Sequence, residues 1–97
     1  MAEIIWSERA IKDLDQIANY IANDSVRYAQ MVVQRLFQRP QVLINNPYLG
    51  RVVPEFNIDT IRELIDGFYR IVYQIDSSKE TISIITIHHS RKEFLNL

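Results

Sequence analysis

The fold of this chain is decided by one stretch, Thr60 to Ile75, which reads T-I-R-E-L-I-D-G-F-Y-R-I-V-Y-Q-I. Apolar residues alternate with other residues in the second half of this stretch, as they do along a half-buried strand. The dipeptide Asp66-Gly67 supplies the positive φ angles that a two-residue hairpin turn needs. We therefore expect two strands joined by a tight turn at Asp66-Gly67.

The second of these strands holds an arginine among apolar residues. Side chains alternate along a strand, so every second residue from Tyr69 to Ile75 shares one face and Arg70 lies on the other. A cation in a sheet interior is costly unless it is paired. Arg70 is therefore expected either to pair with Glu55 or Glu63, or to line a surface that binds an anion.

Length and composition indicate one domain over residues 1–97. The chain has 47% hydrophobic and 24% charged residues, with two glycines and three prolines, which is the profile of a compact globular protein. It has no cysteine, which excludes disulfides and thiolate metal sites. Two histidines without a third ligand do not make a metal site, so we expect neither a metal nor another cofactor.

The charge balance limits the kind of partner. Eleven lysines and arginines face twelve acidic residues, for a net charge of −1, so the chain is no polybasic nucleic-acid binder. An anion site would have to be local and built from a few arginines. No apolar run has the length of a membrane span, and the N-terminus lacks the pattern of a signal peptide, so we expect a cytoplasmic protein without membrane contact.

The first half of the chain predicts a strand followed by a helical hairpin. The apolar run from Ala2 to Trp6 reads as a strand that stops at Ser7, which caps a helix ending near Asn23. Asp24-Ser25 opens a second helix, and its apolar stripe continues to Phe37. Helices joined by so short a link lie antiparallel.

The segment after the second helix is interrupted by proline and glycine. Pro40 predicts either a kink or a break before one more helical turn, which Asn45-Asn46-Pro47 ends. Gly50 predicts a turn in which the backbone adopts a conformation, such as a positive φ, that other residues disfavour. Val52-Val53 begins a strand, which Pro54 limits to an edge or an extended loop.

A last strand, Thr81 to His89, follows a polar turn, and Ser90 could cap a short C-terminal helix. The order β-α-α-β-β-β predicts an α+β fold, in which a largely antiparallel sheet is covered on one face by the helical hairpin. Strict alternation in the last strand would place four residues on one face, namely Ile82, Ile84, Thr86 and His88. The residues between them would then lie on the other face.

Several motifs, taken in order, resemble the RelE/ParE superfamily of bacterial toxins. They are the I-I-W-S start with its acidic helix, the Asp-Ser that opens the second helix, P-x-x-G-R-V-V-P-E, I-R-E-L, Y-R-I-V-Y and H-H-S-R. The resemblance covers nearly the whole chain. It implies a RelE-like fold and the toxin of a type II toxin–antitoxin system, of the kind used in plasmid stabilisation, neutralised by a cognate antitoxin. The expected assemblies are a homodimer or a toxin–antitoxin hetero-oligomer.

The superfamily has two main activities, and the resemblance assigns residues to one of them. RelE-like members cut messenger RNA on the ribosome, which requires a proton acceptor, cations that hold the phosphate and a proton donor. If this chain is such an endoribonuclease, the resemblance makes Glu55, Arg70 and His89 the candidates for catalysis, with the adjacent His88 as the alternative histidine. Four arginines are candidates for anion binding: Arg51, Arg62, Arg70 and Arg91.

The other activity, inhibition of DNA gyrase by ParE-like members, is the one we favour. Only three lysines are present, Lys12, Lys79 and Lys92, and the net charge is negative, whereas affinity for ribosomal RNA is gained by neutralising phosphates. The motifs G-R-V-V-P-E, I-R-E-L and H-S-R also resemble ParE sequences more closely. The alternative partners, ribosome and messenger RNA, remain open at this stage.

The antitoxin is the partner that the resemblance implies for either activity. Toxins of this type present a groove beside the sheet and the helical hairpin, into which a partner lays a helix or a strand. Aromatic residues on the two helices are candidates for this contact: Tyr20, Tyr28 and Phe37.

Overall fold

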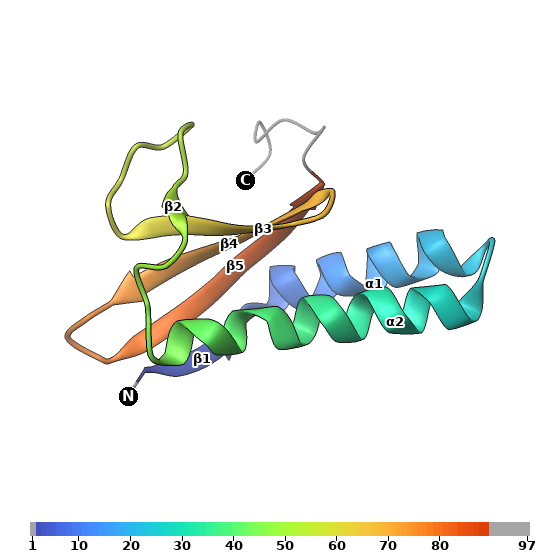
Figure 1. Cartoon of the computed structure of the whole chain (residues 1–97), viewed down its shortest axis with the longest axis horizontal. Coiled ribbons are helices and arrows are strands. Elements are labelled where there is room, and N and C mark those ends of the chain that lie inside the picture. The colour runs from blue at the N-terminus through green and yellow to red at the C-terminus, as the bar shows by residue number, and fades with distance from the viewer. Residues whose placement is uncertain (1, 90–97) are drawn as a thin grey trace.

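The computed structural model describes residues 2–89 and shows a helical hairpin laid across one face of a twisted sheet (Figure 1). The order of elements is a strand, the hairpin, a short 3-10 helix and then four strands. This is the α+β fold expected from the sequence. The elements are β1 (Glu3–Trp6), α1 (Glu8–Ala22), α2 (Val26–Gln38), η1 (Arg39–Ile44), β2 (Arg51–Val52), β3 (Ile61–Asp66), β4 (Tyr69–Asp76) and β5 (Thr81–His89).

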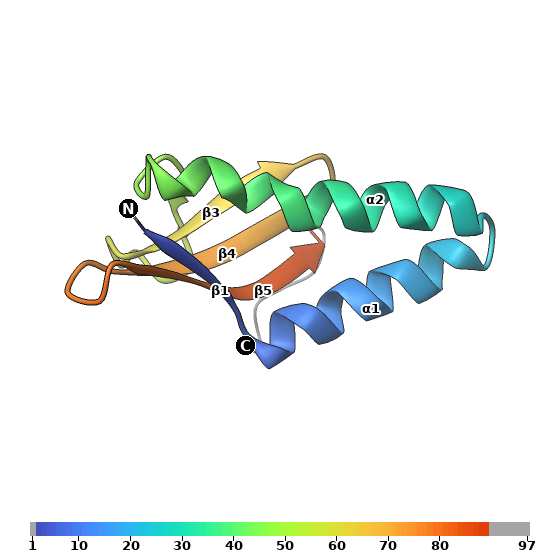
Figure 2. The ribbon, with the colours of Figure 1, turned by 90° about the horizontal axis from the view of Figure 1, so that it is seen from below.

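Within residues 2–89 the sheet has five strands in the order β1-β5-β4-β3-β2. Strand β1 runs parallel to β5, and all other neighbours are antiparallel, so the sheet is largely antiparallel as predicted. The short strand β2 begins at Arg51, one residue earlier than the predicted Val52-Val53, and it occupies the edge to which Pro54 restricts it. One face of the sheet packs against the two helices (Figure 2), and the segment around β2 lies on the side away from them (Figure 1).

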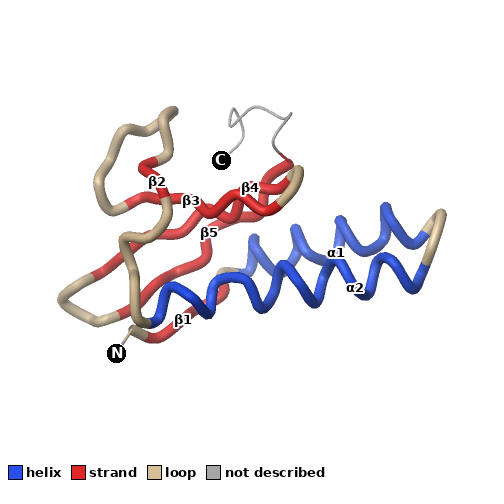
Figure 3. Tube along the Cα trace, viewed as in Figure 1, coloured by secondary structure: helices blue, strands red, loops and turns tan. Residues whose placement is uncertain are grey.

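Side-chain caps start both helices where the sequence places them. The Oγ of Ser7 accepts a hydrogen bond from the Ala10 N–H at 3.0 Å, and the Oγ of Ser25 accepts one from the Tyr28 N–H at 3.1 Å. Helix α1 ends at Ala22, next to the predicted Asn23. The two helices run antiparallel, as Figure 3 shows, because only a short turn separates them.

Pro40 breaks the second helix rather than kinking it. Helix α2 ends at Gln38, and the chain continues as the 3-10 helix η1, with Pro40 in its first turn. At that position the missing N–H of proline removes no bond that the helix needs. The ring of Pro40 is buried.

The turn between β3 and β4 lies one residue later than predicted. Asp66 pairs with Tyr69 in the ladder, so the two loop residues are Gly67 and Phe68 rather than Asp66 and Gly67. Of these two, only Gly67 has a positive φ, +58°. Asp66 stays in the strand, where its Oδ1 lies 3.0 Å from the Nε of Arg35 on α2.

A bulge in β5 overturns the strict alternation predicted for that strand. Val72 pairs with Thr86 and Tyr73 with Ile84, so Ile85 is an extra residue without a partner in β4. Beyond the bulge the faces exchange, and Ile87 joins Ile82 and Ile84 in the core instead of lying opposite to them. The periodicity of the sequence contained no sign of this extra residue.

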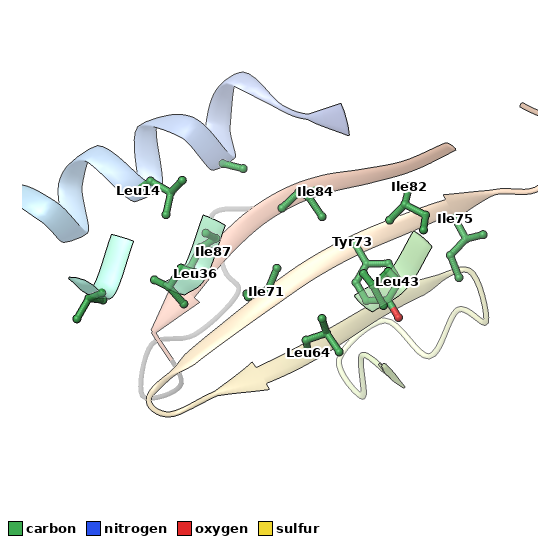
Figure 4. Close-up of a cluster of buried hydrophobic side chains, with 12 residues drawn as sticks. Leu14, Leu36, Leu43, Leu64, Ile71, Tyr73, Ile75, Ile82, Ile84 and Ile87 are labelled. Carbon is green, nitrogen blue, oxygen red and sulfur yellow. The ribbon is translucent and has the colours of Figure 1, made fainter. Parts of the chain in front are cut away.

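The core fills the space between the sheet and the helical hairpin (Figure 4). Tyr73 is fully buried there, and its hydroxyl donates to the Pro47 carbonyl and accepts from the Gly50 N–H, both at 2.9 Å. Gly50 does not have a positive φ, so the reason predicted for this glycine is wrong. A Cβ at Gly50 would lie 2.5 Å from the Glu63 carbonyl oxygen and 2.6 Å from the Tyr73 hydroxyl. Close approach of the backbone, not turn geometry, requires glycine here.

The helices of the described part, residues 2–89, are all too short or too polar to cross a bilayer. The predicted C-terminal helix that begins at Ser90 lies outside the described residues.

Candidate functional site

Four charged side chains form a closed cluster on the face of the sheet away from the helices. We call it the ion-pair cluster, and it consists of Arg51, Glu55, Glu63 and Arg70. The Nε of Arg70 donates to Glu63 Oε1 at 2.6 Å. Its Nη1 and Nη2 donate to the two carboxylate oxygens of Glu55 at 2.8 and 2.9 Å. Arg51 completes the cluster, because its Nε donates to Glu63 Oε2 at 2.5 Å.

Strand register explains why these residues meet. Arg51 of β2 lies directly opposite Glu63 of β3, and residues opposite each other in an antiparallel pair share a face. Arg70 of β4 is opposite Ile65, two residues along β3 from Glu63, so its long side chain reaches Glu63 diagonally. Glu55 approaches from the loop between β2 and β3. Both acids that the sequence offered as partners of Arg70 therefore pair with it.

The cluster fixes the charge state of its members. The hydrogen bonds from Arg70 lower the pKa of Glu55 from 4.5 to about 2. The hydrogen bonds that Arg70 donates to Glu55, and then the one that it donates to Glu63, raise the pKa of Arg70 above its ordinary value. All three guanidinium nitrogens of Arg70 donate to carboxylates, and Glu63 is buried. The cluster is thus two charged pairs with no net charge.

Arg62, another candidate for anion binding, belongs to a separate network. Its Nη2 lies 2.8 Å from Asp59 Oδ1, and its Nη1 donates to the carbonyls of Tyr48 and Gly50. The guanidinium also lies over the Tyr48 ring, 4.9 Å from the ring centre. Of the four predicted arginines, the structure brings Arg51 and Arg70 together and places Arg62 apart, while Arg91 lies outside the described residues.

The three residues proposed for RNA cleavage do not converge. Glu55 and Arg70 are in contact, but His89 is opposite Tyr69, whose ring packs against the core on the helix-covered face. The His89 ring lies edge-on to Tyr69 at 5.7 Å and stacks on Phe68 at 6.1 Å. Arg70 lies on the other face of the sheet from Tyr69 and His89, and the histidine directly opposite it on β5 is His88.

A second surface, a groove of about 1060 Å³, lies between the helical hairpin and the end of the sheet near Gly67. Tyr20 and Tyr28 line it, and Tyr20 is 79% exposed. Phe37 is not part of the groove lining, because its ring stacks on Trp6 at a centre distance of 5.1 Å. Two of the three predicted partner contacts therefore share one surface, and the third lies elsewhere.

Sequence reasoning missed Asp13, which joins α1 to β5 beside this groove. Its Oδ2 accepts hydrogen bonds from the Thr86 hydroxyl and, at 3.0 Å, from the Ile87 N–H. These groups follow the bulge, where β1 no longer covers the edge of β5. No local pattern could have indicated the contact. Among residues 2–89, no group of three or more histidine, cysteine, aspartate or glutamate side chains could hold a metal ion.

The family model described as the ParE toxin of type II toxin–antitoxin systems, parDE, matches residues 4–94. The chain belongs to this family. It is 32% identical over 94 residues to putative toxin Y4kP of Sinorhizobium fredii, and the match covers 95% of each chain. It is also 35% identical over 65 residues to toxin RelE2 of Caulobacter vibrioides, with 67% of this chain and 69% of the relative covered. The RelE/ParE resemblance is thereby confirmed, and the protein is a toxin of a type II toxin–antitoxin system.

Solved structures confirm the fold. A chain of the chromosomal ParDE toxin–antitoxin system from P. aeruginosa matches with a TM-score of 0.75 at 21% identity, covering 92% of this chain and 96% of that one. The isolated RelE toxin of E. coli matches with a TM-score of 0.68 at 15% identity, covering 97% of this chain and 89% of that one. At these identities the matches establish the RelE-like fold of this ParE-family chain and nothing about its target.

Proposed function

We propose that this ParE-family toxin acts by binding its target rather than by cleaving RNA, and that the target is DNA gyrase in the cytoplasm. The observation that carries the proposal is the closed ion-pair cluster. Glu55 and Arg70, the residues that an endoribonuclease would use as base and phosphate ligand, are bound to each other.

The chemistry of the cluster argues against a cleavage site. A general base works best when its pKa lies near the working pH, and Glu55, with a pKa of about 2, accepts a proton poorly at neutral pH. A phosphate bound at Arg70 would have to displace the carboxylate of Glu55, which forms a bidentate, charge-assisted pair with the guanidinium. His89 lies on the other face and is not placed to protonate a leaving group beside Arg70, so such a step would have to use His88, which lies opposite Arg70 on β5.

Two further observations support gyrase as the target. The family whose model matches is the ParE family. The motifs of the sequence also resemble the ParE-like branch of the superfamily, which the resemblance associates with gyrase inhibition. The net charge of −1 does not favour a ribosomal target, because ribosomal RNA attracts proteins that neutralise several of its phosphates. A toxin that binds a protein target needs no such excess of cations.

We also propose that a cognate antitoxin occupies the groove beside the hairpin. The groove combines exposed aromatic rings, Tyr20 and Tyr28, with apolar residues from the sheet, which suits the apolar face of a partner helix. The P. aeruginosa chain with the same fold comes from a toxin–antitoxin system. An antitoxin segment that binds only the folded toxin raises its melting temperature by mass action.

The test compares two purified systems. With gyrase and relaxed plasmid, the toxin is expected to inhibit supercoiling and to trap broken DNA, while in a translation extract a reporter messenger RNA stays intact. In cells without antitoxin, DNA synthesis should stop before protein synthesis. Ribosome-dependent cleavage of the messenger RNA, abolished by Arg70→Ala, together with normal supercoiling, would establish the endoribonuclease instead.

A further inference from the structure

The groove beside the helical hairpin changes in character along its length. One stripe of α1 lines it, in which residues recur every three or four positions from Arg9 to Ile21, so about three turns of helix, or roughly 18 Å, run along the groove. Near the turn between the helices the lining is aromatic and apolar, with Tyr20 and Ile21 from α1 and Tyr28 from α2. Figure 2 shows this end of the hairpin extending beyond the sheet.

The charged residues of the groove lie at its other end, next to the sheet. Arg9 and Asp13 come from the first two turns of α1, and Arg35 comes from the last turn of α2, which runs antiparallel to α1. Among the described residues, the lining positions from 16 to 32 carry no charge. The groove therefore has an uncharged, aromatic end and a charged end.

The charged end favours a negative partner. Asp13 is the one carboxylate among the described residues that line the groove, and its Oδ2 already accepts two hydrogen bonds from β5. Arg9 is exposed, and the side chain of Arg35 is 48% exposed. Arg35 holds Asp66, which lies outside the groove lining, through its Nε at 3.0 Å. A guanidinium has five N–H donors, so Arg35 can keep this pair and still donate to a second acid.

The two ends belong to one surface, as the environment of Tyr69 shows. This residue lines the groove at the start of β4. Burial raises the pKa of Tyr69, Tyr28 raises it further, and Arg35 lowers it. The aromatic end and the cationic end of the groove therefore lie within electrostatic range of the same hydroxyl. A single short helix can contact both.

We propose that Arg9 and Arg35 select and align the partner of this groove, an amphipathic helix of about three turns whose apolar side chains meet the Tyr20 end and whose carboxylates meet the two arginines. The inference rests on the proposed function, which puts an antitoxin segment in the groove, and it adds the chemistry by which that segment is recognised. Complementary charges across an interface speed encounter and exclude partners of the wrong sign. A helix with its acids at the opposite end would bring carboxylates to the tyrosines and none to the arginines.

The test measures the kinetics of peptide binding to the full-length toxin. The probes are overlapping synthetic peptides of about 20 residues that together span the cognate antitoxin, each long enough for three turns of helix. The peptide that binds most tightly is then measured with Arg9→Glu toxin and with the matched control Lys12→Glu. Lys12 is exposed on the same helix and lies outside the groove lining, so the control makes the same change of charge elsewhere. Circular dichroism establishes that the variants fold and that the bound peptide is helical.

In low salt, Arg9→Glu should slow the association of the peptide about tenfold, and about 1 M salt should remove most of this difference, because an exposed charge acts through solvent. Lys12→Glu should change the association rate less than about twofold. Arg35→Gln should act in the same direction as Arg9→Glu but more weakly, since it removes a charge without reversing it. Tyr20→Ser with Tyr28→Ser should instead speed dissociation about tenfold, as the loss of aromatic contacts does.

A charge exchange tests the alignment of the helix. Replacing one acid of the peptide by lysine should restore fast association with Arg9→Glu toxin. That acid should lie about three turns from the apolar peptide residue whose replacement is no longer felt in the tyrosine variant, because Arg9 and Tyr20 are about three turns apart on α1. An acid adjacent to that apolar residue would overturn the proposed alignment.

The outcomes separate this inference from the proposed function. Equal association rates for Arg9→Glu and Lys12→Glu, with faster dissociation from the tyrosine variant, overturn the inference and leave the antitoxin in the groove. Rates that neither the arginine nor the tyrosine variant changes overturn the groove as the antitoxin site, and the inference with it. The inference is also overturned if no single peptide binds or if the bound peptide is not helical. The gyrase proposal is judged separately, because these measurements use toxin and peptide alone.

Discussion

The ion-pair cluster and the groove are opposite kinds of surface on one small sheet. In the cluster, the buried carboxylate of Glu63 and the guanidinium of Arg70 are bound to partners within the same chain. In the groove, Tyr20 and Tyr28 expose aromatic rings that the described residues leave largely uncovered. The charges of the first surface are paired within the chain, whereas the second leaves aromatic rings exposed.

This difference changes how an arginine in a strand is to be interpreted. A buried charge is tolerated in a folded chain when it is paired and hydrogen-bonded, so such a residue needs no ligand to account for it. Arg70 meets this condition through Glu55 and Glu63. Unfilled apolar surface is the better sign of function, because a monomer gains nothing from exposing large aromatic rings together.

The largest effect that separates the two surfaces is expected for Glu63→Ala. It leaves Arg51 without its carboxylate and removes one of the two acids from the buried Arg70, which should lower the free energy of unfolding by about 3–5 kcal/mol. The control Asp59→Ala breaks a pair whose carboxylate is 74% exposed and should cost no more than about 1 kcal/mol. Equal losses in urea unfolding would mean that the cluster is not a structural unit.

A pair of glycine substitutions tests how tightly the chain packs beside the cluster. In Gly50→Ala the new methyl group would meet the Glu63 carbonyl and the Tyr73 hydroxyl, so overpacking should cost about 2–3 kcal/mol. In Gly67→Ala the nearest atom, on Arg35, is 3.9 Å away, and only the positive φ is strained, which should cost about 1 kcal/mol. Urea unfolding of both variants gives the ranking, and a larger loss at Gly67 would contradict it.

Much of the fold could be predicted because its signals are local. The caps Ser7 and Ser25, the apolar stripes of the helices and the break at Pro40 each depend on residues within a few positions of one another. The predictions that failed depend on pairing between strands. The bulge at Ile85 and the shift of the turn to Gly67 are set by register with β4, which no local window contains.

The site was predictable to the same extent. A cation in an alternating strand required a partner, and the candidates Glu55 and Glu63 could be named from the sequence. That both would bind Arg70 at once, and that His89 would fall on the other face, followed only from strand register. The family resemblance implied a groove beside the hairpin, and two candidate contacts, Tyr20 and Tyr28, line the groove of the structure. Its far wall is built from the turn and the end of β5, which are distant in sequence.

The groove should respond to substitution in the opposite way to the cluster. Tyr20→Ser with Tyr28→Ser removes exposed rings, so the free energy of unfolding should change by less than about 1 kcal/mol. Binding of a cognate antitoxin peptide, measured by calorimetry, should weaken at least tenfold, or about 1.4 kcal/mol. Unchanged affinity would place the antitoxin elsewhere, for instance over Phe37. The control Val26→Ser with Met31→Ser should alter neither quantity.

The smallest effect is a pH dependence that belongs to the cluster and not to the groove. The pKa of Glu55 is about 2 in the folded chain against 4.5 ordinarily, so its stabilisation is present above pH 4.5 and is lost as the pH falls toward 2. Since its side chain is 42% exposed, solvent screens the pair and reduces this contribution to about 1 kcal/mol.

Subtracting the stability of Glu55→Gln from that of the wild type at each pH removes the titration of the other carboxylates. The difference should be constant from neutral pH to about pH 5 and shrink between pH 4.5 and 2. A difference that fades near neutral pH would mean that Glu55 titrates there. Glu55 would then be able to act as a general base, and the proposal that the cluster has no catalytic role would be wrong.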